Sequence, residues 1–358
     1  MNIYYYIIFY IIIFILSLFA IRVEDKKRKW LFVIICISFF IFYGFRDASI
    51  GYDTKTYIRY YNSKDVNSYI AQEKIFYYIA FIFWTLKIPT SIYISFLTFL
   101  VILMSAMAYY LIFKLDNKYL CLAYFGMFCL PYSIMMNVNV VRQGITISAL
   151  LLSAALLDLN HKKIAIVIAI IGCLFHYMGI IVLAGMVILS IVKEKKYAYK
   201  LTIAGCVVGV VADVMGFGRK FLGFFPENQL TKRVLSYLRV QTTRTDIIKI
   251  VFYLLIALIV VNILMKYKIS IGYIDKLMLS IMMMAGMWTS CMTVATRIII
   301  SMDMIIPISL LNPKIVRQIE AKNGLRIKKM YIKIIIGACI IMYVYGLFFN
   351  PVKVNLGF

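Results

Sequence analysis

Five polar positions or motifs in a largely apolar chain carry residue types that could bind a phosphate or activate a hydroxyl group. They are Arg46 with Gly51-Tyr52-Asp53-Thr54 and Tyr57, then Glu73, Arg142-Gln143-Gly144, Phe175-His176-Tyr177 and Arg297. The planar fork of a guanidinium matches the oxygens of a phosphate in a bidentate way, so the arginines are candidate phosphate ligands. Arg142 and Arg297 on one side of a membrane would form a diphosphate site.

Three residues of these motifs, Asp53, Glu73 and His176, are candidates for proton transfer. Gly51 permits a tight turn that would hold Asp53 toward the membrane surface. The carboxylate of Asp53 or Glu73 could accept a proton from a sugar hydroxyl. His176 lies between two apolar halves, and an ionisable side chain inside a membrane is costly enough to favour a functional role.

Structural interpretations compete with each of these roles. The acids and bases near Asp53 could be weakly paired residues of a solvated loop. Arg142 and Arg297 could extend outward as interfacial anchors, and a single histidine could be a packing residue. The only other histidine, His161, is in a basic loop, and the seven cysteines are scattered without a CxxC pair, so we expect neither a metal nor a cofactor.

The composition excludes a soluble globule. Hydrophobic residues make up 64% of the 358 residues, charged residues only 15%, and the mean hydropathy is +0.91. The apolar runs lack the ten-residue alternation of barrel strands, so we predict an all-α, polytopic membrane protein forming one integral domain over residues 1–358. The net charge of +24 lies largely in short loops, which favours roles in orientation and anionic-lipid binding over nucleic-acid binding.

The apolar runs predict about twelve transmembrane or re-entrant helices, several of them short for a bilayer of roughly 30 Å. The expected crossings are Ile3–Ile21, Trp30–Tyr43, Ser91–Phe113, Tyr119–Met136, Gln143–Leu157, Ile164–Phe175, Tyr177–Val192, Leu201–Met215, Ile247–Met265, Lys276–Met292, Ile298–Leu311 and Tyr331–Phe349.

Short basic loops, including Arg22–Lys29, Lys114–Lys118 and Asn312–Lys329, are expected on the cytoplasmic side. This orientation requires the chain to turn near His176 and requires Ile75–Lys87 to be re-entrant or interfacial.

Two polar segments, Gly44–Lys74 and Phe217–Asp246, then face outward. The second is basic, and its Arg233, Arg239 and Arg244 are candidate ligands for an anionic substrate.

The order and spacing of these motifs resemble the EpsG family of bacterial exopolysaccharide proteins, relatives of the Wzy-type polysaccharide polymerases. The resemblance rests on Arg46 with Gly51 to Tyr57, Glu73, Arg142-Gln143-Gly144, Phe175-His176-Tyr177 and Arg297, from about residue 43 to residue 307. One departure is that Arg297 is followed by Ile298-Ile299-Ile300 where aromatic residues are expected.

The resemblance implies a GT-C-like glycosyltransferase in the bacterial cytoplasmic membrane, with an active site facing outward. It would join repeat units carried on polyprenyl diphosphate into a capsule, exopolysaccharide or O-antigen. Arg142 and Arg297 would stabilise the diphosphate, Arg46 and Gln143 would help to bind substrate, and His176, Asp53 or Glu73 would activate the acceptor. Expected partners are the lipid-linked donor and acceptor, membrane lipid and a chain-length regulator.

Three alternatives remain open. A flippase for lipid-linked oligosaccharides would also need cations near a lipid diphosphate, although it would more often show internal repeats. An oligosaccharide ligase would use the same donor with another acceptor. A purely structural membrane subunit would tolerate loss of the outer arginines.

Overall fold

A computed structural model describes residues 3–47, 50–51, 53–62, 74–114, 116–192, 194–215, 244–267 and 269–349. Every regular element in these ranges is a helix, which confirms the all-α prediction. The chain forms two compact units, Met1–Gly179 with Asp303–Phe358, and Ile180–Met302. Glu73, Arg233 and Arg239 lie outside the described residues.

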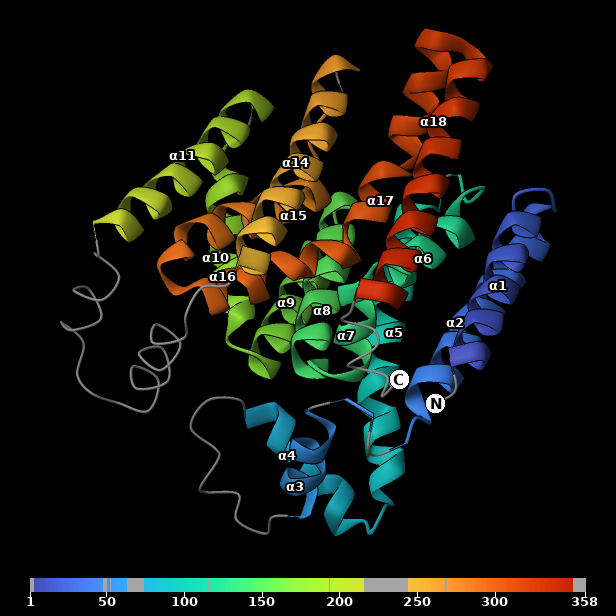
Figure 1. Cartoon of the computed structure of the whole chain (residues 1–358), viewed down its shortest axis with the longest axis vertical. Coiled ribbons are helices and arrows are strands. Elements are labelled where there is room, and N and C mark those ends of the chain that lie inside the picture. Colours follow the sequence, from blue (N-terminus) through green and yellow to red (C-terminus); the bar gives the residue numbers. More distant parts are fainter. Residues whose placement is uncertain are drawn as a thin grey trace. The chain divides into compact units, whose positions relative to one another are not determined.

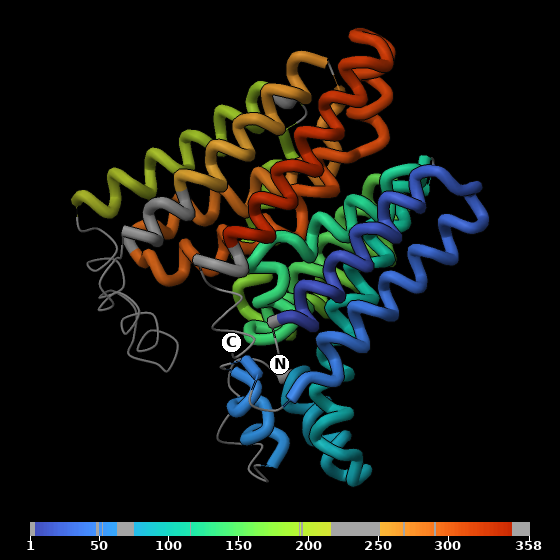
Figure 2. The backbone as a smooth tube through the Cα atoms, turned by 45° about the vertical axis from the view of Figure 1, so that its right-hand side comes forward, coloured from blue at the N-terminus to red at the C-terminus, as the bar shows by residue number. Residues whose placement is uncertain are grey.

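The first unit is a helical bundle with a short helical pair at one end (Figures 1 and 2). Its helices are α1 (Ile3–Ala20), α2 (Asp25–Gly44), α3 (Thr54–Asn62), α4 (Lys74–Thr85), α5 (Thr90–Ile112), α6 (Leu120–Cys129), α7 (Pro131–Val138), α8 (Val141–Asp158), α9 (Lys162–Phe175), α17 (Ile306–Leu310) and α18 (Pro313–Phe349). Helix α5 packs against α2 and α8, and α8 packs against α9. Helices α3 and α4 contact each other, with α3 also on α5 and α4 on α9.

The second unit contains most of α10 (Met178–Ile191), then α11 (Lys195–Val214), α14 (Arg244–Lys266), α15 (Tyr273–Met287), a 3₁₀ turn η1 (Thr289–Cys291) and α16 (Met292–Ile299). Helix α15 packs against α11, α14 and α16. Ser280 of α15 also donates a hydrogen bond to the carbonyl of Val182 at 2.5 Å. The turn η2 (Ile300–Met304) leads back to the first unit.

The apolar helices fit a membrane protein. Among the described residues, three helices are long and apolar enough to cross a bilayer, namely α5, α8 and Lys196–Val214 of α11. Two pairs interrupted by sharp bends would raise the number to five, and one of them is α6 with α7, bent by 80°. The count of about twelve crossings stays a prediction.

One of the two required interruptions, the break near His176, is confirmed. Helix α9 ends at Phe175 and α10 begins at Met178, while His176 between them is extended with φ −155° and ψ 127°. The apolar segment before Pro89 forms the 12-residue helix α4, and its re-entrant or interfacial position stays a prediction.

Two expected boundaries are wrong. The basic segment Asn312–Lys329 is mostly the first part of α18, because its lysines, arginines and glutamine are good helix formers. Helical geometry breaks within it at Gly324, with φ 78° and ψ 173°. The expected helix Ile298–Leu311 is divided among α16, η2 and α17, where Pro307 begins a new turn.

Loops expected on the cytoplasmic side meet at one end of the first unit. The guanidinium of Arg28 donates to the side chain of Asn117 and to the carbonyl of Ala20, the latter at 2.8 Å. Arg317 of α18 forms an ion pair of 3.5 Å with Asp116. Three separate basic segments therefore share one end of the bundle, as the predicted orientation requires.

Candidate functional site

Arg46 follows the end of α2 that is opposite to the basic segments, and its guanidinium forms hydrogen bonds to α2, α5 and α7. Its Nη1 donates to the carbonyl of Tyr43 at 2.8 Å and to Oγ1 of Thr98 on α5 at 2.9 Å. Its Nη2 donates to the carbonyl of Val138, at the end of α7, at 3.0 Å. Burial lowers the pKa of Arg46 to about 10, so it stays cationic at neutral pH. Its Nε is buried with no hydrogen-bond partner among the described residues.

The turn at Gly51 lies directly on the end of α7. Gly51 has φ +89°, and a Cβ there would come within 2.5 Å of the carbonyl oxygen of Val138. Only glycine satisfies both the conformation and the close approach. The backbone N–H of Asp53 then donates to Oδ1 of Asn139 at 2.7 Å, and the hydroxyl of Tyr57 donates to the Asn139 carbonyl at 2.8 Å. The predicted turn is thus fixed against the α7–α8 junction.

Three aromatic rings surround the guanidinium of Arg142, at the first turn of α8. Its Cζ lies 5.7 Å from the ring centroid of Tyr57, 6.0 Å from that of Tyr60 and 5.4 Å from that of Phe76. We call these three rings the aromatic cage. Cation–π attraction in such a setting holds a cation in place without neutralising its charge. Arg142 is half-buried, and the aromatic cage holds its guanidinium in place.

Asp53 and Arg142 act on the same hydroxyl group. Burial raises the pKa of Tyr57 to about 12, with Arg142 opposing and Asp53 reinforcing the rise. A guanidinium and a carboxylate therefore have opposite effects on the pKa of one buried tyrosine. Asp53 itself is partly exposed.

The remaining part of the Arg142-Gln143-Gly144 motif serves helix packing. Gln143 is only 1% exposed. A Cβ at Gly144 would lie 2.4 Å from the carbonyl oxygen of Met136, so glycine lets α8 begin close beside α7. Direct contact of Gln143 with a substrate stays a prediction.

His176 lies at the same end of the α8–α9 pair as Arg142. The hydroxyl of Thr146 contacts the carbonyl of Arg142 at 3.1 Å and that of Gly172 at 2.8 Å. Gly172 precedes His176 by one helical turn. The short loop between α8 and α9 makes the two helices antiparallel, so the start of one meets the end of the other.

The hydrogen bonding of His176 defines its chemistry. The backbone N–H of Met178 donates to Nδ1 at 3.1 Å, and the imidazole is 7% exposed. A neutral imidazole that accepts at Nδ1 carries its proton on Nε2. In this geometry Nε2 of His176 is a donor, whereas proton abstraction would need a different tautomer.

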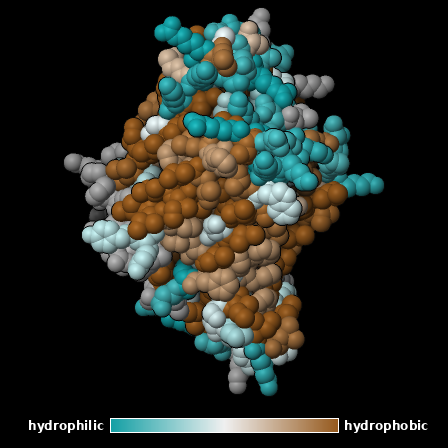
Figure 3. Space-filling model, turned by 90° about the vertical axis from the view of Figure 1, so that its right-hand side faces the viewer, coloured by the Kyte–Doolittle hydropathy of each residue, from teal (hydrophilic) through white to brown (hydrophobic). Residues whose placement is uncertain are grey.

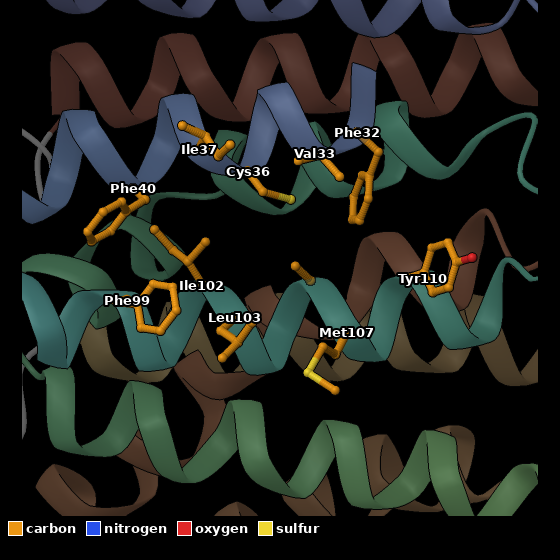
Figure 4. Close-up of a pocket in the computed structure, with 11 residues that line it drawn as sticks. Phe32, Val33, Cys36, Ile37, Phe40, Phe99, Ile102, Leu103, Met107 and Tyr110 are labelled. Carbon is orange, nitrogen blue, oxygen red and sulfur yellow. The ribbon is translucent and has the colours of Figure 1, made fainter. Parts of the chain in front are cut away.

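An apolar groove of about 410 Å³ runs between α2 and α5 (Figure 4). Cys36, Phe40, Phe99, Leu103 and Met107 are among its lining residues. Phe99 follows Thr98, which binds Arg46, so this end of the groove is at the level of the arginine along α5.

Sequence reasoning missed three polar residues of this unit. Asn139 and Thr98 hold Asp53, Tyr57 and Arg46 through the bonds described above. Asp303 is fully buried, and its Oδ2 accepts a bond of 2.8 Å from the N–H of Tyr132 in the first turn of α7. The position of Asp303 within the apolar run 298–311 could have identified it from the sequence, because an ionisable residue in an apolar run is costly, as it is for His176.

For Arg297 and Arg244, the two other predicted arginines on described helices, the structure shows the helix but not a role in the site. Arg297 lies on α16 in the second unit, half-buried, and its pairing with Arg142 stays a prediction. Arg244 begins α14, with its side chain outside the described set. Within the described residues, no three His, Cys, Asp or Glu side chains cluster as metal ligands.

The order of these elements matches a known family. The model of the EpsG family matches residues 29–355, which include every candidate site residue. The chain belongs to the EpsG family. No curated protein and no solved structure matches it. EpsG membership, together with the apolar helices, gives this membrane protein a general role in exopolysaccharide biosynthesis.

Proposed function

We propose that this EpsG-family protein is a polysaccharide polymerase. It joins oligosaccharide repeat units carried on polyprenyl diphosphate, at the outer face of the bacterial cytoplasmic membrane. The observation that carries the proposal is Arg142, a half-buried guanidinium held by the aromatic cage, whose Tyr57 is bonded to the same Asn139 as the backbone of Asp53. Cations for a leaving diphosphate and a carboxylate for an attacking hydroxyl are the two requirements of this glycosyl transfer.

In the proposed reaction the acceptor hydroxyl attacks the anomeric carbon of the donor. The new glycosidic bond forms as the bond from that carbon to the diphosphate oxygen breaks, and the lipid diphosphate leaves with the electron pair. Arg142 stabilises the charge that develops on this leaving group. Arg46, with its buried Nε, supplies a second cation at the same end of the unit.

The proton of the acceptor hydroxyl passes to Asp53 in this mechanism. Of the three predicted bases, Asp53 combines partial exposure with an anchored backbone. His176 is assigned a donor role, because its Nδ1 already accepts from Met178. The Nε2 proton would bind a sugar or phosphate oxygen and orient it.

The apolar groove between α2 and α5 is assigned to the polyprenyl chain. Its lining contains almost no polar surface, which suits a hydrocarbon, and Phe40 and Phe99 lie at the same end of it (Figure 4), the end of α2 that Arg46 follows. A lipid diphosphate would place its chain in the groove and its charge among the arginines.

The test compares Arg142→Ala and Arg142→Lys in a strain that lacks its own polymerase, with protein levels matched. Both variants should lose long polymer and accumulate single lipid-linked repeat units on the outer face, since lysine cannot reproduce the bidentate fork. Arg59→Ala is the matched control, because Arg59 is an exposed arginine on α3, the helix that carries the cage residues Tyr57 and Tyr60.

Other outcomes would reject the proposal in distinct ways. Repeat units trapped inside the cell would indicate a flippase, and normal polymer with a missing transfer to another acceptor would indicate a ligase. Unchanged polymer would remove Arg142 from the mechanism.

A further inference from the structure

A second cavity, of about 670 Å³, lies at the other end of the first unit. Arg22, Lys118, Lys329 and Lys333 line it, from the segment after α1, the segment before α6 and the helix α18. We call it the basic pocket. We propose that the basic pocket binds the headgroup of an anionic phospholipid.

The charge of the basic pocket is not balanced by the protein. None of its lining residues is acidic, and none of the four cations forms an ion pair with a described residue. Two carboxylates interact with the lining residue Tyr119, namely Asp116 and Glu320. Each is already paired, Asp116 with Arg317 and Glu320 with Lys328. Four like charges around one cavity repel one another, and a bound anion would relieve that repulsion.

The other walls of the basic pocket are apolar. Ile15, Leu18 and Phe19 line it from α1, and Ile332 lines it from α18. Lys329, Ile332 and Lys333 share one face of α18, because residues three and four apart are neighbours on a helix. A soluble phosphate would bind the cations only and would leave the apolar walls without a partner. A ligand with a phosphate and hydrocarbon chains would use both kinds of wall.

The position of the basic pocket fits the inner leaflet. Arg22, Lys118 and Lys329 belong to the three loops expected on the cytoplasmic side, where basic pockets between helices meet anionic headgroups. On the molecular face that carries α1 and α2, hydrophilic side chains gather at one end, beyond a broad hydrophobic band (Figure 3).

The basic pocket is separate from the Arg46–Arg142 site. Arg22 and Arg46 follow the ends of the antiparallel helices α1 and α2, and a helix of 20 residues such as α2 is about 30 Å long. A lipid bound there would stabilise the fold without contacting the proposed diphosphate site, so this proposal does not depend on the proposed function.

The test is the thermal unfolding midpoint of the detergent-purified full chain with three added probes. These are phosphatidylglycerol, phosphatidylcholine and inorganic phosphate. Phosphatidylglycerol should raise the midpoint by about 5 °C, since a ligand of the native state stabilises it, whereas the other two should not. The double variant Lys329→Gln/Lys333→Gln should lose this gain. The control Lys26→Gln/Lys27→Gln removes two exposed lysines of α2 outside the basic pocket and should keep it.

Native mass spectrometry of the same samples supplies a second readout. The wild type and the control should retain bound phosphatidylglycerol, and the pocket variant should retain at least fivefold less. An equal gain with phosphatidylcholine, or an unchanged gain in the pocket variant, would overturn the proposal. A full gain from inorganic phosphate would also overturn it, by identifying a site for soluble anions instead of lipid.

Discussion

The hydroxyl of Thr146 donates to the carbonyl of Gly172 at 2.8 Å and thereby ties the first turns of α8 to the last turn of α9. Arg142 is one turn before Thr146, and His176 is one turn after Gly172. The bond therefore sets the spacing between two residues that lie 34 positions apart in sequence. A single hydroxyl positions the cation relative to the imidazole.

Thr146→Val should lower polymer formation about fivefold while leaving the protein folded. Valine keeps the shape of threonine but removes the bond, and one buried hydrogen bond is worth about 1 kcal/mol. Thr146→Ser retains the hydroxyl and should stay near wild-type yield. Polymer yield at matched protein level is the measurement, and equal yields from both variants would contradict a positioning role.

Gly51→Ala should abolish polymer formation or reduce it at least tenfold. The added methyl group meets the Val138 carbonyl within 2.5 Å, and the φ of +89° strains any L-residue, by about 1–3 kcal/mol. The turn would move and pull Asp53 away from Asn139. Gly337→Ala provides the control, because its added Cβ meets nothing within 4 Å. Equal activity of both variants would show that the turn is not needed in this form.

Arg46 should give the reaction an alkaline limit. Its pKa of about 10 lies below the ordinary value for a guanidinium, so the side chain is cationic at neutral pH and loses its proton as the pH rises through about 10. Substrate binding should fall in the same range. Tyr57, with its pKa raised to about 12, stays neutral there.

Arg46→Lys should move this limit to lower pH. An amine ordinarily titrates near 10.4, and the same burial would lower its pKa further. The measurement is binding of a lipid diphosphate in vesicles as a function of pH. Identical alkaline limits in wild type and variant would exclude Arg46 as the titrating ligand.

The sequence predicted the helices and the turn well where a strong local signal exists. The break at His176 followed from glycines and a costly histidine between apolar halves, and the Gly51 turn from glycine chemistry. Predicted helix boundaries were wrong where helix propensity and polarity indicate different structures. In the first part of α18 the basic residues are compatible with both a loop and an exposed helix.

Contacts between distant segments could not be predicted in this way. Nothing in the local sequence of Asn139 states that its two oxygens bind Asp53 and Tyr57, more than 80 positions earlier. The aromatic cage has the same origin, since its rings come from α3 and α4 and its cation from α8. Spacing identified the charged residue of the candidate site, and tertiary packing supplied the residues that hold it.

Two isosteric variants can distinguish a hydrogen-bond donor role of His176 from a role as the base. Asparagine places an acceptor near the position of Nδ1, and glutamine places an amide N–H near that of Nε2. If His176 donates from Nε2, His176→Gln should retain about a tenth or more of the wild-type polymer yield, and His176→Asn about a hundredth. The donor role also predicts that the yield of His176→Gln follows the same acid limb as the wild type, because in that role the limb does not arise from the imidazole. Two other observations together would instead assign His176 as the base. Both variants would be inactive, and the wild type would show an acid limb near the ordinary histidine pKa of about 6.5 that disappears on substitution.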